Sequence, residues 1–151
     1  MINDLLQGFS IFFSGGLFLH ELTHGLVGLP FAFFLYKKTR RIKYFLLTMA
    51  TLYLIDLDHS VDYLLYHGFR ISLVDIFKFE YFINTQRATV PLHAWEWVTI
   101  LGFLVYREKE FKSFKAVYLF SLIPHLIYDS YTTGSVVFYS IIYRITTGFF
   151  I

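Results

Sequence analysis

The chain has 151 residues, enough for one domain, and its formal net charge is only +2. Hydrophobic residues make up 56% of it and aromatic residues 22%, and the mean hydropathy of +0.55 is well above that of ordinary soluble domains. The absence of cysteine excludes thiolate metal sites, iron–sulfur clusters and disulfides, which leaves His, Asp and Glu as the strong metal ligands. We therefore expect a single all-α domain over residues 1–151, embedded in a lipid bilayer as a multi-pass protein.

The first predicted helix runs from about Leu6 to Tyr36, an apolar stretch longer than the roughly 20 residues that span a bilayer. Near its middle stands HELTH, which places His20 and His24 on one helical face with Glu21 beside them. Two imidazoles at this spacing can chelate one metal ion, and the carboxylate can act as a general base. Because ionisable side chains are costly inside a membrane, the pattern favours a functional role.

A short basic loop follows the first helix and contains Lys37, Lys38, Arg40, Arg41 and Lys43. Under the positive-inside rule such a loop faces the cytoplasm, so we expect the N-terminus on the outer side. The cluster does not indicate nucleic-acid binding, because it lies where two membrane helices meet the headgroups and no recognition motif accompanies it.

The second predicted helix, from about Tyr44 to Tyr66, is apolar in its first half, and its second half carries Asp56, Asp58, His59 and Asp62 on one polar arc. Each charged side chain at the centre of a membrane helix costs about 2.5–3.5 kcal/mol on insertion scales. Divalent cations would offset that cost, since Zn, Mn, Fe and Mg prefer carboxylate and imidazole ligands. His59 is either a direct ligand, a hydrogen-bond partner of Asp62 or a cap of the polar arc.

The stretch from Gly68 to Val90 is too charged to span a bilayer and is predicted to lie as an amphipathic segment in the outer interface. Three further helices are predicted after it, from Pro91 to Tyr106, from Phe114 to Tyr131, and from Val136 to the end of the chain. About five membrane spans would then place the C-terminus in the cytoplasm.

Two further polar pairs lie at helical spacings, His93 with Glu96 and His125 with Asp129. The topology puts all these polar groups in the outer half of the bilayer. We therefore predict a metal site formed by His20, His24, Asp56, Asp58, His59, His93, His125 and Asp129. Glu96 can instead orient His93, and Arg144 in the last helix is a counter-ion, a phosphate binder or a snorkelling residue.

Four blocks carry a family resemblance: THGLVG at Thr23–Gly28, LIDLDHS at Leu54–Ser60, LHAWEW at Leu92–Trp97 and PHLIYDSYTTGS at Pro124–Ser135. Their order and character resemble the YdjM-like membrane-bound metal-dependent hydrolases. The resemblance implies a metal-binding set of His24, Asp56, Asp58, His93, His125 and Asp129, with His59 as a neighbour. The chain departs from the family where ATVPLHAWEW keeps one histidine in place of an H-R-G-x-T-H-S block.

Three functions are compatible with these residues. The first is a hydrolase in which a divalent metal, Zn foremost with Mn, Fe or Mg as alternatives, activates water for attack on an ester or phosphoester. Glu21 or Asp58 would be the catalytic base, and the substrate would be amphiphilic, such as a phospholipid or a lipid-linked phosphate.

The second function is an intramembrane zinc metalloprotease, in which His20 and His24 bind zinc, Glu21 activates water and Asp56 or Asp58 is the third ligand. An NP-x-LDG element would be expected near that aspartate and is absent from the sequence. The third is a metal-ion or proton transporter, since intramembrane Asp and His also line ion pathways. The absence of internal repeats disfavours that alternative.

Overall fold

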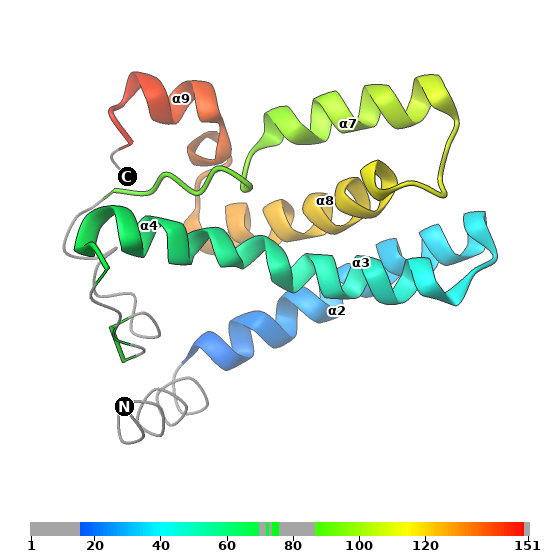
Figure 1. Cartoon of the computed structure of the whole chain (residues 1–151), viewed down its shortest axis with the longest axis horizontal. Helices are drawn as coiled ribbons and strands as arrows, with labels where there is room; N and C mark the ends of the chain where they lie inside the picture. Colours follow the sequence, from blue (N-terminus) through cyan, green and yellow to red (C-terminus); the bar gives the residue numbers. More distant parts are fainter. Residues whose placement is uncertain (1–15, 70–71, 73, 76–86, 150–151) are drawn as a thin grey trace.

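The computed structural model describes residues 16–69, 72, 74–75 and 87–149, and every regular element in these ranges is helical, which confirms the all-α class (Figure 1). The elements are α2 (Gly16–Thr39), α3 (Ile42–Leu54), the 3-10 helix η1 (Ile55–Leu57), α4 (Asp58–His67), α7 (Trp95–Glu108), α8 (Phe114–Thr133), the 3-10 helix η2 (Val137–Tyr139) and α9 (Ile141–Thr146).

Helix α8 is the centre of the bundle, since it packs against α2, α3 and α7 and buries ten of its side chains. Its ends are well defined. The Ser113 hydroxyl accepts a hydrogen bond from the amide of Ala116 at the start, and Gly134 adopts the left-handed conformation at the end. Because α8 carries His125 and Asp129 on its buried face, these two side chains point toward the surrounding helices.

Helix boundaries differ from the sequence prediction in two places that matter for the site. The second predicted helix is interrupted by η1, which contains Asp56. The third begins at Trp95 rather than Pro91, so His93 lies in the irregular segment before α7. The predicted interfacial segment 68–90 falls mostly outside the described residues, as does the start of the first predicted helix.

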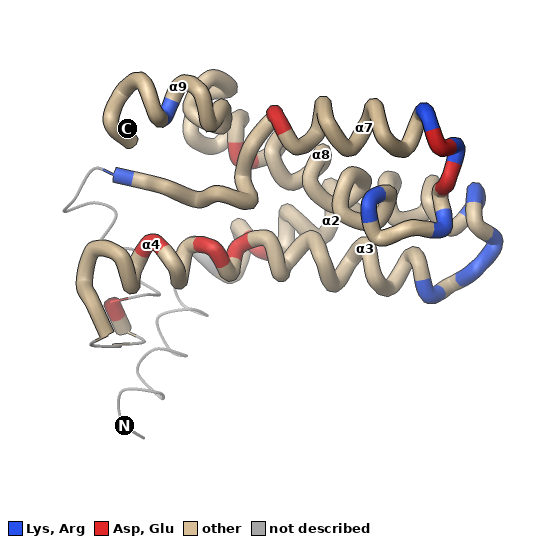
Figure 2. Tube along the Cα trace, turned by 45° about the horizontal axis from the view of Figure 1, so that its top comes forward, with Lys and Arg blue, Asp and Glu red and all other residues tan. Residues whose placement is uncertain are grey.

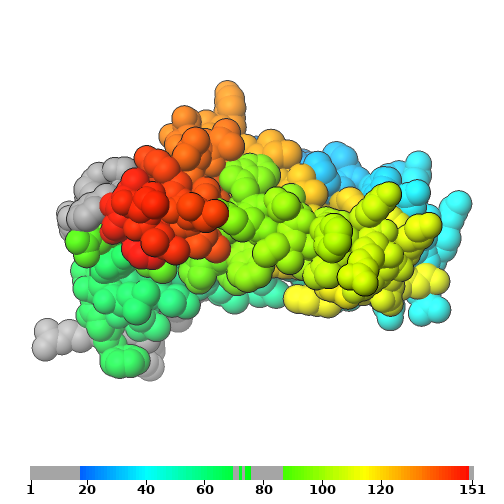
Figure 3. All heavy atoms as spheres, turned by 90° about the horizontal axis from the view of Figure 1, so that it is seen from above, coloured from blue at the N-terminus to red at the C-terminus, as the bar shows by residue number. Residues whose placement is uncertain are grey.

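The predicted fifth span does not form in the described residues. The chain after α8 instead makes η2 and then α9, whose six residues extend only about 9 Å at 1.5 Å per residue. Ser140 caps α9 through a bond from the Tyr143 amide, and the chain turns again at Gly148, where φ is +67°. Figure 3 shows α9 beside α7 on one face of the molecule.

Most of the described Lys and Arg residues gather at one end of the bundle, where α2 turns into α3 and α7 connects to α8, while Arg87 and Arg144 lie away from it (Figure 2). Helix α9 lies at the opposite end, so the described C-terminal residues do not return to the basic side as a fifth span would require. Among the described helices, one stretch is long and apolar enough to cross a membrane, Phe18–Thr39 of α2. Soluble core helices and signal sequences share these properties, so the multi-pass arrangement stays a prediction.

Candidate metal centre

The bundle brings together seven of the eight predicted metal ligands from α2, η1, α4, the segment before α7, and α8. They form four overlapping groups of three, and within each group the ligand atoms lie within 4.8 Å of one another: His20, His24 and Asp129; His24, Asp56 and His125; Asp56, His59 and His93; and His93, His125 and Asp129. The described structure can therefore hold a metal ion at this cluster.

The inner group consists of His93 Nε2, His125 Nε2, Asp56 Oδ1 and Asp129 Oδ2. The two imidazole nitrogens are 2.8 Å apart, and Asp56 Oδ1 lies 3.3 Å from each of them. Asp129 Oδ2 lies 3.3 Å from His125 and 3.7 Å from His93. Ligands bound to zinc at 2.0–2.1 Å in a tetrahedron are separated by about 3.3–3.4 Å, and three of these five separations are 3.3 Å, while the other two are 2.8 and 3.7 Å.

The outer group is formed by His20 and His24 of HELTH together with the other oxygen of Asp129. The two Nε2 atoms are 3.0 Å apart, and Asp129 Oδ1 lies 3.0 Å from His24 and 3.6 Å from His20. The His24 ring stacks on that of His125, with centroids 4.0 Å apart. Tyr128 packs edge-on against His24 at 4.8 Å, a contact that fixes the ring and that sequence reasoning missed.

His59 lies at the rim of the cluster. Its Nε2 is 3.8 Å from Asp56 Oδ1, its ring centroid is 5.1 Å from that of His93, and 26% of its side chain is exposed. This position suits a peripheral ligand or a partner of Asp56, where the sequence predicted a direct ligand or a partner of Asp62.

Asp58 lies beside the inner group and belongs to none of the ligand groups found among the described residues. Its Oδ2 is 3.0 Å from His93 Nδ1 and accepts a hydrogen bond from the Leu92 amide at 2.8 Å. A carboxylate on the far nitrogen of a metal-binding imidazole fixes its orientation and leaves Nε2 free to ligate. The geometry thus places Asp58 behind His93, where the sequence predicted a direct ligand and a catalytic base.

Glu21 is half-buried on α2, within electrostatic reach of Asp56, His20 and His125. Like Asp58, it belongs to none of the ligand groups in the part of the chain that the structure describes. Its carboxylate therefore lies near the cluster and outside its ligand groups.

The segment that carries His93 is held by side chains from distant parts of the chain. Arg144, fully buried, donates from its guanidinium to the carbonyls of Thr89 at 2.6 Å, Val90 at 2.9 Å and His93 at 2.8 Å. Asp62 accepts from the amides of Thr89 and Val90 at 2.9 and 3.3 Å. Buried irregular backbone needs such partners, since it has no helical ones.

Arg144 therefore positions the backbone of His93, a role that none of its predicted alternatives describes. No local spacing signals this role, because Arg144 and His93 are 51 positions apart.

Glu96 does not contact His93 but caps α9, accepting bonds from the Ser140 hydroxyl at 2.6 Å and the Ile141 amide at 3.1 Å. The two neighbouring tryptophans donate to backbone carbonyls, Trp95 to Val136 at 3.1 Å and Trp97 to Pro91 at 2.8 Å. These contacts fix the segment around His93 from the side of α7.

Burial makes the cluster costly unless a cation binds there. His24, His93 and His125 are each at most 1% exposed, and Asp129 is 6% exposed. Among the described side chains, Asp56 Oδ2 is buried without a hydrogen-bond partner. Two Nε2 atoms at hydrogen-bond distance from each other cannot both carry protons, and carboxylates grouped together repel each other. A divalent cation relieves both problems and therefore fits this donor set.

Protein-family models, curated proteins and solved structures were compared with the chain, and none of them matches it. The case for a function therefore depends on the geometry of the cluster.

Proposed function

We propose that this chain is a membrane-embedded, divalent-metal-dependent hydrolase acting on an ester or phosphoester of a lipid or lipid-linked substrate. The observation that carries the proposal is the inner group, in which four ligand atoms from three separate segments converge, with five separations of 2.8–3.7 Å that are close to the ~3.3–3.4 Å of a tetrahedral zinc site. The resemblance to YdjM-like hydrolases supports it, because all six residues that it implies lie in or against this cluster.

The residues divide the chemistry among them. The chemistry that a divalent cation would supply at this position is a lower pKa for its bound water and stabilisation of negative charge on the attacked group. Four side chains would hold it, Asp56, His93, His125 and Asp129. Asp58 keeps His93 in its ligating orientation, and Glu21 accepts the proton that water loses.

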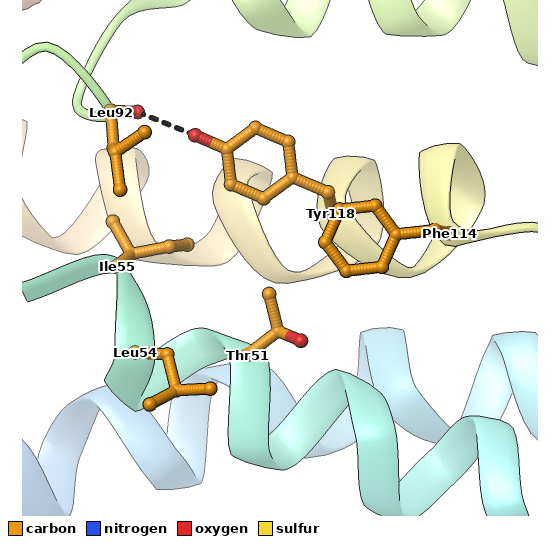
Figure 4. Close-up of a pocket in the computed structure, with 6 residues that line it drawn as sticks. All are labelled: Thr51, Leu54, Ile55, Leu92, Phe114 and Tyr118. Carbon is orange, nitrogen blue, oxygen red and sulfur yellow. Dashed lines mark hydrogen bonds between the residues drawn. The ribbon is translucent and has the colours of Figure 1, made fainter.

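An apolar cavity beside the centre supports a substrate with a hydrocarbon chain. The cavity has a volume of about 270 Å³ and is lined by Thr51, Leu54, Ile55, Leu92, Phe114 and Tyr118 (Figure 4). Two of the lining residues, Ile55 and Leu92, directly precede Asp56 and His93 in the sequence. Tyr118 donates a hydrogen bond to the Leu92 carbonyl at 3.0 Å, which joins the cavity wall to the same segment.

The outer surface of the bundle supports a bilayer as the surroundings. Large apolar side chains are exposed along the helices, including Leu19, Leu26 and Phe33 on α2, Leu46 on α3, Phe103 on α7 and Ile127 on α8. An apolar surface of this extent is unusual on a soluble monomer. The proposed site would then lie in the half of the bilayer away from the basic end.

The intramembrane zinc protease is the second candidate, because His20, His24 and Asp129 form a three-ligand group of their own. In that case Asp129 of α8 would replace the predicted Asp56 or Asp58 as third ligand. The protease gives no role to the inner pair His93 and His125, which is why we favour the hydrolase.

Hydrolysis of lipid substrates by protein purified in nanodiscs tests the proposal. We would incubate the zinc-loaded protein with phospholipids and polyprenyl phosphates and measure the released water-soluble products. Activity should disappear after chelation and return with metal, and Glu21→Gln should lower it about 100-fold or more, the usual contribution of a general base.

Glu108→Gln is the matched control. It removes an acidic charge at the end of α7, far from the segment that carries His93, and it should leave activity unchanged. Cleavage of peptides but not lipids would favour the protease. Metal flux across proteoliposomes without any hydrolysis would favour a transporter.

A further inference from the structure

We infer that the centre is binuclear: His20, His24 and Asp129 hold a second cation, and Asp129 bridges it to the cation of the inner group. This inference rests on the proposed function and deepens it, because it assigns the HELTH histidines to the same site.

The two oxygens of Asp129 are the first argument. Oδ1 lies 3.0 Å from His24 Nε2 and 3.6 Å from His20 Nε2, whereas Oδ2 lies 3.3 Å from His125 Nε2 and 3.7 Å from His93 Nε2. One carboxylate therefore presents each of its oxygens to a different pair of imidazoles. A single bound cation would leave one of these pairs without a ligand partner.

The number of donors is the second argument. Seven ligating side chains converge, whereas a structural zinc is almost always four-coordinate. None of the groups found in the described structure contains both His20 and His93, so the donors separate into an inner and an outer set. Four-coordinate zinc in the inner set is complete without His20 or His24.

Asp56 supplies the third argument, because it lies between the two sets. It shares a ligand group with His24 and His125 as well as one with His59 and His93. Its Oδ1 faces the inner imidazoles, while Oδ2 is buried and without a hydrogen-bond partner among the described residues. Because Asp56 shares a ligand group with His24, we expect its carboxylate to fill the position that the three other donors of the outer cation leave open.

A binuclear centre narrows the substrate class. Two neighbouring cations stabilise both the attacking and the leaving oxygen of an in-line displacement, an arrangement used by phosphatases and nucleases. We therefore expect a phosphoester as the substrate, with its hydrocarbon chain in the apolar cavity lined by Ile55 and Leu92.

Metal stoichiometry tests the inference independently of activity. Protein in detergent, dialysed against buffered zinc, should contain two zinc ions per chain by elemental analysis, and His20→Ala should reduce this to one. Asp129→Asn should weaken both positions. His67→Ala is the matched control, because His67 stacks on Tyr63 and lies in none of the described ligand groups, so two ions should remain.

Cobalt titration provides a second readout, in which the visible absorption should saturate at two equivalents in the wild type and at one in His20→Ala. Circular dichroism of each variant excludes unfolding as the cause of metal loss, and a His20→Gln variant replaces any His20→Ala protein that fails to fold. One equivalent of bound metal in the wild type, unchanged by His20→Ala, would overturn the second metal position. That result would not contradict the proposed hydrolase. Two equivalents without lipid hydrolysis would support the binuclear centre and overturn the hydrolase.

Discussion

The Asp58 carboxylate contacts His93 Nδ1 and accepts a hydrogen bond from the Leu92 amide. We therefore expect Asp58 to affect metal binding through His93. Asp58→Asn should weaken zinc binding about 10–100-fold, the usual loss when the outer partner of a ligating histidine is changed. Asp58→Ala should weaken zinc binding further, because this change also leaves the Leu92 amide without its hydrogen-bond acceptor.

Competition with a chromophoric zinc chelator measures this loss, with Glu108→Gln as the control for removing a carboxylate. Unchanged affinity in Asp58→Ala would show that His93 needs no such partner. Loss of one whole equivalent of zinc would make Asp58 a direct ligand.

Arg144 is the second residue whose effect is indirect. Its guanidinium satisfies three carbonyls of the segment before α7, and a lysine ammonium cannot reach all of them with the same planar geometry. Arg144→Lys should lower the free energy of unfolding by about 2–5 kcal/mol, because one or more buried carbonyls lose their donor.

Thermal unfolding in detergent measures this change. In Arg144→Lys both the zinc affinity and the thermal stability should fall. Arg107→Lys, at the exposed basic end, is the control and should change neither quantity. Full stability in Arg144→Lys would show that the segment holds its shape without the guanidinium.

At the scale of the elements, the close packing of α2 on α3 depends on Gly28. A Cβ at this position would collide with the δ-carbon of the fully buried Leu52. Gly28→Ala should therefore destabilise the protein by about 1–3 kcal/mol, the cost of overpacking a core, despite the better helix propensity of alanine.

Gly102 offers a matched control, because a Cβ there meets nothing within 4 Å on α7. Gly102→Ala should raise stability by about 0.5–1 kcal/mol through helix propensity alone. Equal melting temperatures for the two variants, measured in the same detergent, would mean that α2 and α3 can move apart at little cost.

Local spacing made part of the site predictable. The pairs His20 with His24 and His125 with Asp129 lie on single helices, so their common faces follow from a period of 3.6 residues, and the structure brings both pairs together. Composition also predicted the all-α class, because the long apolar runs suit helices.

The remaining features depend on long-range contacts. Pro91 suggested a helix start, yet bonds from Asp62 and Arg144 hold the surrounding residues as irregular backbone, and α7 begins only at Trp95. Likewise the apolar run after Val136 is divided by Ser140 and Glu96, whose contact starts a short helix instead of a span. Such partners are set by the folded bundle, so no local pattern reveals them.

At the scale of the whole molecule, the bundle has a basic end and a metal-binding half. The basic turns of the chain lie together, and the ligands on α2 and α8 are near the helix ends away from those turns. This polarity fits a membrane protein whose basic end faces the cytoplasm. If the predicted multi-pass arrangement holds, the described helices would make an even number of crossings before α9 and leave α9 on the outer side.

Cysteine labelling tests this topology cleanly, because the chain contains no cysteine of its own. In sealed, right-side-out vesicles, an impermeant maleimide should label Ile145→Cys on α9, which is 60% exposed, but not Lys43→Cys at the basic end until the vesicles are opened. Lys112→Cys, in the other basic turn, should behave like Lys43→Cys. Protection of all three introduced cysteines from the maleimide would show that the C-terminus returns to the cytoplasm, as a fifth span requires. Recovery of the protein in the soluble fraction would exclude the membrane arrangement.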